Sequence, residues 1–154
     1  MLLVTMGTQK RKCDRIINAV INAGIKDDIV IQAYYFPEKE YDNIKFYQFI
    51  SYDEMEKLLD EADVVVTSGT GSIFRALNKG KKVIIFPRLG RYDEAIDDHG
   101  LDMQILKDQG YAEFVIEAND FKKIYNSTLK TKFKKYVSNK ENFIQKLEEE
   151  ISKL

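Results

Sequence analysis

The residues best suited to chemistry in this chain lie in one short loop that follows an apolar stretch. Val64, Val65 and Val66 are followed by the small and hydroxyl residues Thr67-Ser68-Gly69-Thr70-Gly71-Ser72 and then by a helical pattern. A loop of this composition that opens a helix exposes backbone N–H groups, and the helix dipole also favours negative charge there. The segment therefore predicts a phosphate or diphosphate site, although alone it is equally consistent with a tight strand-to-helix turn.

Two further loops carry residues that suit the same ligand. Gly7 and Thr8 follow the first apolar stretch, and the loop after Val83 to Phe86 holds two arginines and an acidic cluster: Arg88, Arg91, Asp93, Glu94, Asp97, Asp98 and the only histidine, His99. Amides and hydroxyls suit phosphates, Arg matches their charge, and carboxylates accept hydrogen bonds from sugar hydroxyls. Because ligands bind beyond the carboxyl ends of parallel strands, we expect the three loops to form one nucleotide-diphosphate site.

The familiar phosphate and metal motifs are absent from the sequence. Ser72 stands where a P-loop requires Lys, and the first strand-to-helix unit has only Gly7 where a Rossmann fingerprint requires three glycines. His99 has no second histidine, Cys pair or EF-hand spacing beside it, so no dedicated metal site is expected.

Periodicity predicts the elements that position these loops. Strands are expected at Leu2–Thr5, Ile29–Tyr34, Lys45–Ile50, Val64–Thr67, Val83–Phe86 and Tyr111–Ile116. Helices are expected around Ile16 to Ile21, after an Asp53 cap with Met55, Leu58 and Leu59 inward, after the Gly69 loop, and over Asp97–Gln109 with Gly110 at its end. Alternating helices and wholly apolar strands predict an α/β fold, a single Rossmann-like doubly wound parallel sheet.

The C-terminal tail is expected to be helical from about Asp120 to the end. Residues 122–140 hold seven lysines and no acid, which suits an anionic lipid, an acidic partner or a solvated face equally. An apolar stripe follows at Phe143, Ile144, Leu147, Ile151 and Leu154. We divide the chain into a domain at 1–120 and a helical tail at 121–154, which packs on the domain or on a partner.

Composition places the chain among ordinary globular proteins. Its 154 residues fit one domain, and a net charge of −1 gives no field for nucleic acid. The single Cys13 fits a reducing cytosol and is expected to be an unreactive residue of the first helix. Neither a membrane-spanning stretch nor a signal peptide is recognisable, so a cytoplasmic protein is expected.

The order of these motifs resembles the C-terminal, donor-binding half of glycosyltransferase family 28, which has the GT-B fold. The matching segments are VTMGT at 4–8, FISYDEMEKLLDEADVVVTSGTGSI at 49–73, GKKVIIFPR at 80–88 and DEAIDDHG at 93–100. The chain is most similar to stand-alone half-enzymes. These are the small subunit of the two-subunit dolichol-linked N-acetylglucosaminyltransferase and its bacterial counterparts in paired exopolysaccharide and capsule glycosyltransferases.

The resemblance implies roles for individual residues. Gly7 and Thr8 would face a UDP-sugar donor, Phe49 and Ile50 would contact the uracil, and Asp98 and His99 would meet the donor sugar. The diphosphate would lie against Gly69, Thr70, Gly71 and Ser72, with Arg88 nearby. The chain departs from the family at three positions: Arg75 replaces a Glu that grips the ribose, Ser68 often corresponds to His, and Gly100 often to Gln.

The resemblance also implies an activity. The chain would be the donor-binding, catalytic-type subunit of an inverting two-component transferase, moving a hexose or N-acetylhexosamine from a UDP-sugar to a lipid-linked saccharide without a metal or other cofactor. A membrane-associated partner would supply the acceptor half and hold the chain at the inner face of the membrane. His99, Asp98 and Glu94 are candidates for the general base. Two alternatives stay open: a non-catalytic enhancer of a partner transferase, and an unrelated small nucleotide-binding enzyme.

Overall fold

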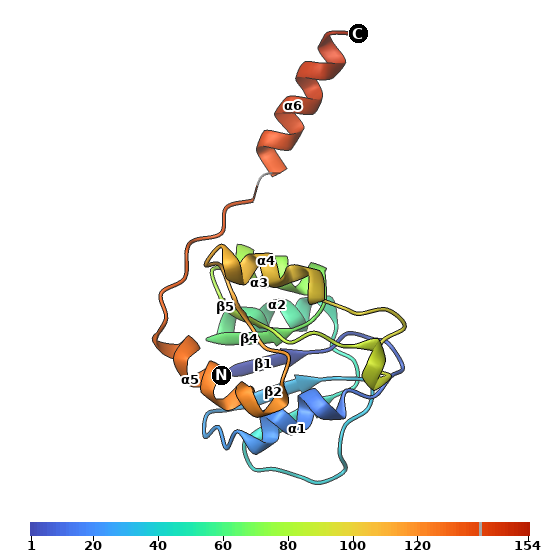
Figure 1. The fold of residues 1–154 in the computed structure, drawn as a ribbon, viewed down its shortest axis with the longest axis vertical. Helices are drawn as coiled ribbons and strands as arrows, with labels where there is room; N and C mark the ends of the chain where they lie inside the picture. The colour runs from blue at the N-terminus through green and yellow to red at the C-terminus, as the bar shows by residue number, and fades with distance from the viewer. Residues whose placement is uncertain (139) are drawn as a thin grey trace.

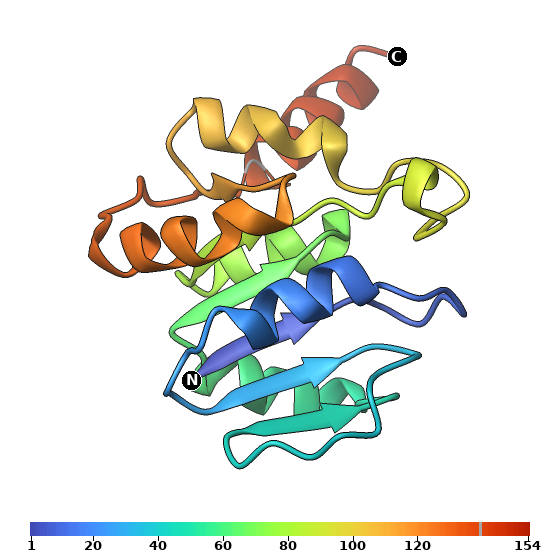
Figure 2. The same cartoon turned by 60° about the horizontal axis from the view of Figure 1, so that its bottom comes forward.

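Six parallel strands form one twisted sheet in the order β3-β2-β1-β4-β5-β6 (Figures 1 and 2). The structure, a computed structural model, describes residues 1–138 and 140–154, without the side chains of 140–144. The strands are β1 (Leu2–Thr5), β2 (Ile29–Gln32), β3 (Ile44–Tyr47), β4 (Val64–Thr67), β5 (Lys82–Ile85) and β6 (Glu113–Phe114). This order, with the chain reversing direction across the sheet between β1 and β4, confirms the predicted doubly wound fold.

Helices cover both faces of the sheet, because the strand side chains are apolar on both sides. One buried cluster joins the strands to α1 (Asp14–Asn22) and α5 (Phe121–Lys130) through residues such as Ile16, Val20 and Phe121. The other joins them to α2 (Tyr52–Glu61), α3 (Thr70–Asn78) and α4 (Gln104–Asp108). The central strands β1 and β4 are buried along their whole length, which fixes their register.

Several predicted boundaries are wrong in detail. β2 ends at Gln32 rather than Tyr34, β3 is Ile44–Tyr47, and β6 keeps only two of the six expected residues. The cap of α2 is Ser51, whose hydroxyl accepts a hydrogen bond from the Glu54 amide at 3.3 Å, while Asp53 lies in the first turn.

The helix predicted over Asp97–Gln109 is also wrong over its first part. The backbones of His99 and Arg88 pair in a short antiparallel bridge, and Gly100 has a left-handed backbone with φ +91°. A short 3₁₀ turn at Leu101–Met103 then leads into α4, which Gly110 ends with φ +84° as predicted. Residues 97–100 therefore form a loop on the site edge instead of a helix.

The C-terminal tail is not one helix. α5 packs on α1 through buried Phe121 and Tyr125, so its start belongs to the body of the domain. Residues 131–138 are not helical, and α6 (Lys140–Ser152) extends away from the sheet (Figure 1). In the apolar stripe, Leu147, Ile151 and Leu154 are exposed, whereas Phe143 and Ile144 lie outside the described side chains.

Within the described residues, no helix combines the length and the apolar character that crossing a bilayer requires.

Candidate functional site

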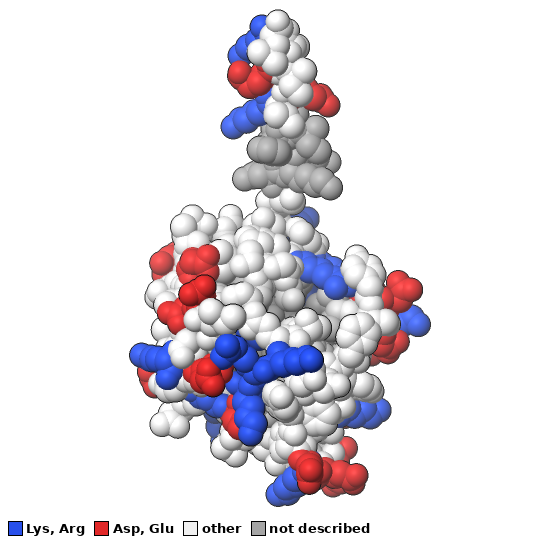
Figure 3. Space-filling model, turned by 90° about the vertical axis from the view of Figure 1, so that its right-hand side faces the viewer, with Lys and Arg blue, Asp and Glu red and all other residues white. Residues whose placement is uncertain are grey.

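Three loops meet at the carboxyl edge of the sheet, as the sequence predicts. They follow β1, β4 and β5, three neighbouring strands whose last residues align as Thr5, Thr67 and Ile85. Figure 3 faces this edge, and Lys and Arg side chains gather in its lower part beside several acids. Arg88 connects the loops: its Nε donates to Ser68 Oγ at 3.2 Å, and its Nη2 lies 3.9 Å from where a side chain at Gly7 would begin.

Gly7 is held in place by a residue that sequence reasoning missed. Gln32, at the end of β2, is 4% exposed, and its Oε1 accepts hydrogen bonds from the Gly7 amide at 3.1 Å and from Thr5 Oγ1 at 3.0 Å. Its Nε2 donates to the Gly7 carbonyl at 2.8 Å. Gly7 has φ +81°, a conformation that a side chain would strain. The signal available in the sequence was a single polar residue ending the apolar run Ile29–Gln32.

Arg88 is a buried cation whose contact with His99 selects the tautomer of the neutral imidazole. It is 3% exposed, and Nη2 lies 2.8 Å from His99 Nδ1. Because a guanidinium can only donate, Nδ1 accepts and the proton of a neutral His99 sits on Nε2. In this arrangement His99 can donate a hydrogen bond to a ligand but has no free lone pair with which to accept a proton.

The N-terminus of α3 is open toward the same edge. Its N-cap residue, Gly69, provides no side-chain hydrogen bond, and no acidic residue lies in the first turn. Gly71 is exposed, and nothing lies within 4 Å of the position that its Cβ would take. The amides of the first turn therefore remain available to an anion, in contrast to α2, which is capped by Ser51 and carries Asp53 and Glu54.

Gly100 packs against the loop between β4 and α3. A Cβ at Gly100 would stand 2.5 Å from the carbonyl oxygen of Ser68, so only glycine lets the 98–100 loop lie against the β4–α3 loop.

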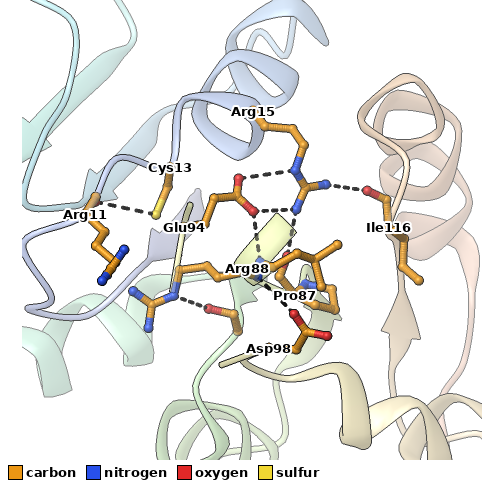
Figure 4. Close-up of polar contacts among 11 residues, drawn as sticks. Arg11, Cys13, Arg15, Pro87, Arg88, Glu94, Asp98 and Ile116 are labelled. Carbon is orange, nitrogen blue, oxygen red and sulfur yellow. Dashed lines mark hydrogen bonds and ion pairs between the residues drawn. The ribbon is translucent and has the colours of Figure 1, made fainter. Parts of the chain in front are cut away.

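Glu94 is buried beside the loops that follow β1 and β5, in an ion pair with Arg15 (Figure 4). It is 2% exposed, and its Oε1 accepts from Arg15 Nη2 at 2.9 Å and from the Leu89 amide at 3.0 Å, while Oε2 accepts from Arg15 Nε at 3.2 Å. Arg15 also donates to the carbonyls of Pro87 and Ile116. The pair ties α1 to the β5 loop and to the chain after β6, which is an architectural role that sequence reasoning did not see.

Asp98 is exposed at the site edge. Its Oδ1 accepts from the Gly90 amide at 2.9 Å, which fixes the loop, and Oδ2 has no partner in the part of the chain that the structure describes. Of the three candidate bases, Asp98 is thus the one with an accessible acceptor oxygen.

Arg75 contacts α2, the helix that begins just after the predicted uracil stretch. Phe49 is 72% exposed and Ile50 half-buried, just before α2. Arg75 forms an ion pair with Glu56 of α2 and lies 4.2 Å from the ring centre of Tyr52. Hydrogen bonds from Lys79 and then Arg75 lower the pKa of Glu56 below its usual value. A carboxylate therefore does stand beside position 75, on the neighbouring helix.

Thr8 is exposed next to Gly7. Cys13 is buried, and burial raises the pKa of its thiol, as expected for an unreactive cysteine. No group of three metal-ligating side chains occurs among the described residues.

The fold and the edge together define a Rossmann-like α/β domain with its candidate ligand site at the carboxyl ends of the strands. Residues 2–154 match the description "Glycosyltransferase family 28 C-terminal domain". The chain therefore belongs to this family, and the family predicted from the motifs is confirmed. The comparison with curated proteins gave no match.

Solved structures of sugar-nucleotide enzymes share the fold. A Listeria monocytogenes protein described as a UDP-N-acetylglucosamine 2-epimerase superposes with a TM-score of 0.62 and 14% identity, over 84% of this chain and 36% of its own. The UDP-GlcNAc 2-epimerase of Neisseria meningitidis, bound to UDP-GlcNAc, superposes with a TM-score of 0.61 and 11% identity, over 94% of this chain and 42% of its own. The glycosyltransferase SnogD of Streptomyces nogalater superposes with a TM-score of 0.53 and 16% identity, over 77% of this chain and 31% of its own. The chain thus spans less than half of each of these proteins and corresponds to one half of a GT-B fold.

Proposed function

We propose that this chain binds the UDP-sugar donor of a glycosyltransferase and supplies the catalytic half of its active site. The observation that carries the proposal is the open N-terminus of α3, beside the buried Arg88 and the exposed Asp98. Family membership supports it, and one of the similar structures is described as bound to UDP-GlcNAc.

The proposed reaction is an inverting single displacement. The acceptor hydroxyl oxygen attacks the anomeric carbon while the bond to the β-phosphate oxygen breaks, and a general base takes the hydroxyl proton. The amides of residues 70–72 and the dipole of α3 stabilise the charge that develops on UDP, with Arg88 adding a fixed positive charge nearby. Because the amides and Arg88 are already in position before the reaction, little reorganisation of the protein is needed as the charge on UDP develops.

We assign the base to Asp98 or to a partner residue, rather than to His99 or Glu94. Arg88 occupies the acceptor nitrogen of His99, and Glu94 is buried in its ion pair with Arg15. His99 Nε2 is better suited to donate to a hydroxyl of the donor sugar.

We further propose that Glu56 takes over the ribose contact that Arg75 cannot make. Exchanging the two residues, Glu56→Arg with Arg75→Glu, keeps the ion pair and keeps a carboxylate at the ribose. UDP affinity should therefore stay within about threefold of the native value, whereas loss of the hydrogen bond would lower it about tenfold. Glu56→Gln alone should weaken UDP binding about tenfold in calorimetry, and the Asp60→Asn control on the same helix should not. Unchanged affinity in Glu56→Gln would remove Glu56 from the site.

A membrane-associated partner is proposed to supply the acceptor half, with a lipid-linked saccharide as the acceptor. Half of a GT-B fold leaves one wall of the active site open, and α6 presents Leu147, Ile151 and Leu154 to solvent. Removing residues 139–154 should abolish co-purification with a co-expressed acceptor-binding half, while UDP binding is unchanged. Undiminished co-purification would exclude α6 as the contact.

A non-catalytic enhancer is the second candidate, because Arg75 departs from the family at the ribose position. Calorimetry with UDP separates the two: an enhancer without a donor site gives no binding.

A further inference from the structure

A second charged surface lies at the opposite edge of the sheet from the candidate site. The non-helical residues 131–136 run past the turn between α3 and β5, and the two segments enclose a groove of about 270 Å³. Lysines and aromatic residues dominate its lining: Lys81, Lys82, Lys132, Lys134, Lys135, Tyr111, Phe133 and Tyr136. Figure 1 shows this segment on the left side of the domain, with the site loops on the right.

The groove is a fixed feature because its tail segment is anchored. The Lys134 amide donates to the Gly110 carbonyl at 3.0 Å, and the Tyr136 ring packs against Phe74 and Tyr111, with ring centres 5.4 Å and 5.9 Å apart. These contacts fix the backbone of residues 131–136, so the lysines of this segment extend from a defined position on the surface.

Most lysines of this groove carry a positive charge that no nearby carboxylate balances. Lys81 and Lys82 donate to the backbone carbonyls of Asp60 and Leu129, both at 2.8 Å, and carbonyl oxygens do not neutralise an ammonium. None of the five lysines forms an ion pair within the residues that the structure describes, and no Asp or Glu is among the described lining residues. The Asp60 carboxylate lies near Lys81 and offsets its charge, so the groove has a local excess of about four positive charges although the whole chain carries −1.

Two exposed apolar side chains flank the lysine segment in the sequence, one at the end of α5 and one after the groove. Leu129 is 45% and Val137 71% exposed, one on each side of Lys130 to Lys135. A surface that alternates cations with apolar and aromatic residues matches the boundary between anionic headgroups and acyl chains. An acidic protein would use the charge but not the exposed Leu129 and Val137.

We propose that this lysine groove binds the surface of an anionic phospholipid bilayer directly, without a partner. The groove takes the lipid phosphates, while Leu129 and Val137 enter the interfacial layer. The contact leaves the carboxyl edge of the sheet free, and it stands independently of the donor function proposed above.

Vesicle sedimentation tests the proposal with the full chain. The protein should bind vesicles of phosphatidylcholine mixed equally with phosphatidylglycerol, bind pure phosphatidylcholine weakly, and lose binding as salt rises. Each lysine near an anionic bilayer strengthens binding about fivefold, so replacing Lys132, Lys134 and Lys135 together by Gln should weaken it by about a hundredfold. Replacing Lys26, Lys39 and Lys57, three exposed lysines elsewhere, makes the same charge change and should reduce binding by less than tenfold.

The readouts separate this inference from the donor proposal. UDP affinity should be equal in the native chain and both triple variants, which also verifies folding. Absence of binding to the mixed vesicles, or equal losses in the two triple variants, would overturn the proposal. Binding to soluble polyglutamate without binding to vesicles would also overturn it and assign the groove to an acidic polypeptide.

Discussion

Replacing Gly71 by leucine is expected to abolish UDP binding while the protein remains folded. The new side chain would fill the space in front of the α3 amides, where the structure leaves room for a Cβ. Hydrogen bonds to a charged group contribute about 1.5–3 kcal/mol each, so losing two of them should lower UDP affinity by at least about a hundredfold. Calorimetry measures the loss directly.

Stability should not fall in this variant, because leucine is a better helix former than glycine by up to about 1 kcal/mol. Asn78→Leu is the matched control: it adds the same side chain at an exposed position at the other end of α3 and should leave UDP affinity unchanged. If Gly71→Leu bound UDP like the native chain, the diphosphate could not lie against this helix.

Removing Arg15 is expected to give the largest loss of stability. Arg15→Ala leaves the Glu94 carboxylate buried with only the Leu89 amide as a partner. Breaking a buried ion pair in this way costs about 3–5 kcal/mol of unfolding free energy, which urea denaturation measures. The variant also frees the carbonyls of Pro87 and Ile116, which lie on two different segments.

The double variant Arg15→Met with Glu94→Leu is the companion measurement. It removes both charges and should recover much of the loss, since apolar residues of similar volume can replace buried ion pairs. A decrease below about 1 kcal/mol in Arg15→Ala would show that Glu94 is solvated, and its candidacy as the general base would then return.

The fold was largely predictable from the sequence because its cause is local. Runs such as Val64 to Val66 are apolar on both faces, which only a covered parallel sheet accommodates. The errors arose where tertiary contacts decide. Asp97–Gln109 has helical composition, but the Arg88–His99 backbone bridge and the close approach of Gly100 to Ser68 hold its beginning as a loop. The tail leaves the helix at Thr131 because Lys134 and Tyr136 bind to the Gly110 turn instead.

The site was predictable only as a set of loops. The edge, the open α3 start and Arg88 follow from residue types and strand order. The sequence could not show that Glu94 pairs with Arg15, 79 positions away, or that Gln32 holds the Gly7 loop. These contacts depend on side-chain direction across strands and helices, which residue spacing does not encode. The pairing of Arg75 with Glu56 is likewise a contact between two helices. It places a carboxylate beside position 75, which the sequence alone does not show.

Comparing the affinities of uridine, UMP and UDP by calorimetry tests the central claim most directly. If the α3 amides and Arg88 form a diphosphate site, affinity should rise with each phosphate, and the gain from uridine to UDP should disappear in Gly71→Leu. Equal affinities for the three compounds, or no binding of UDP by the native chain, would contradict the account.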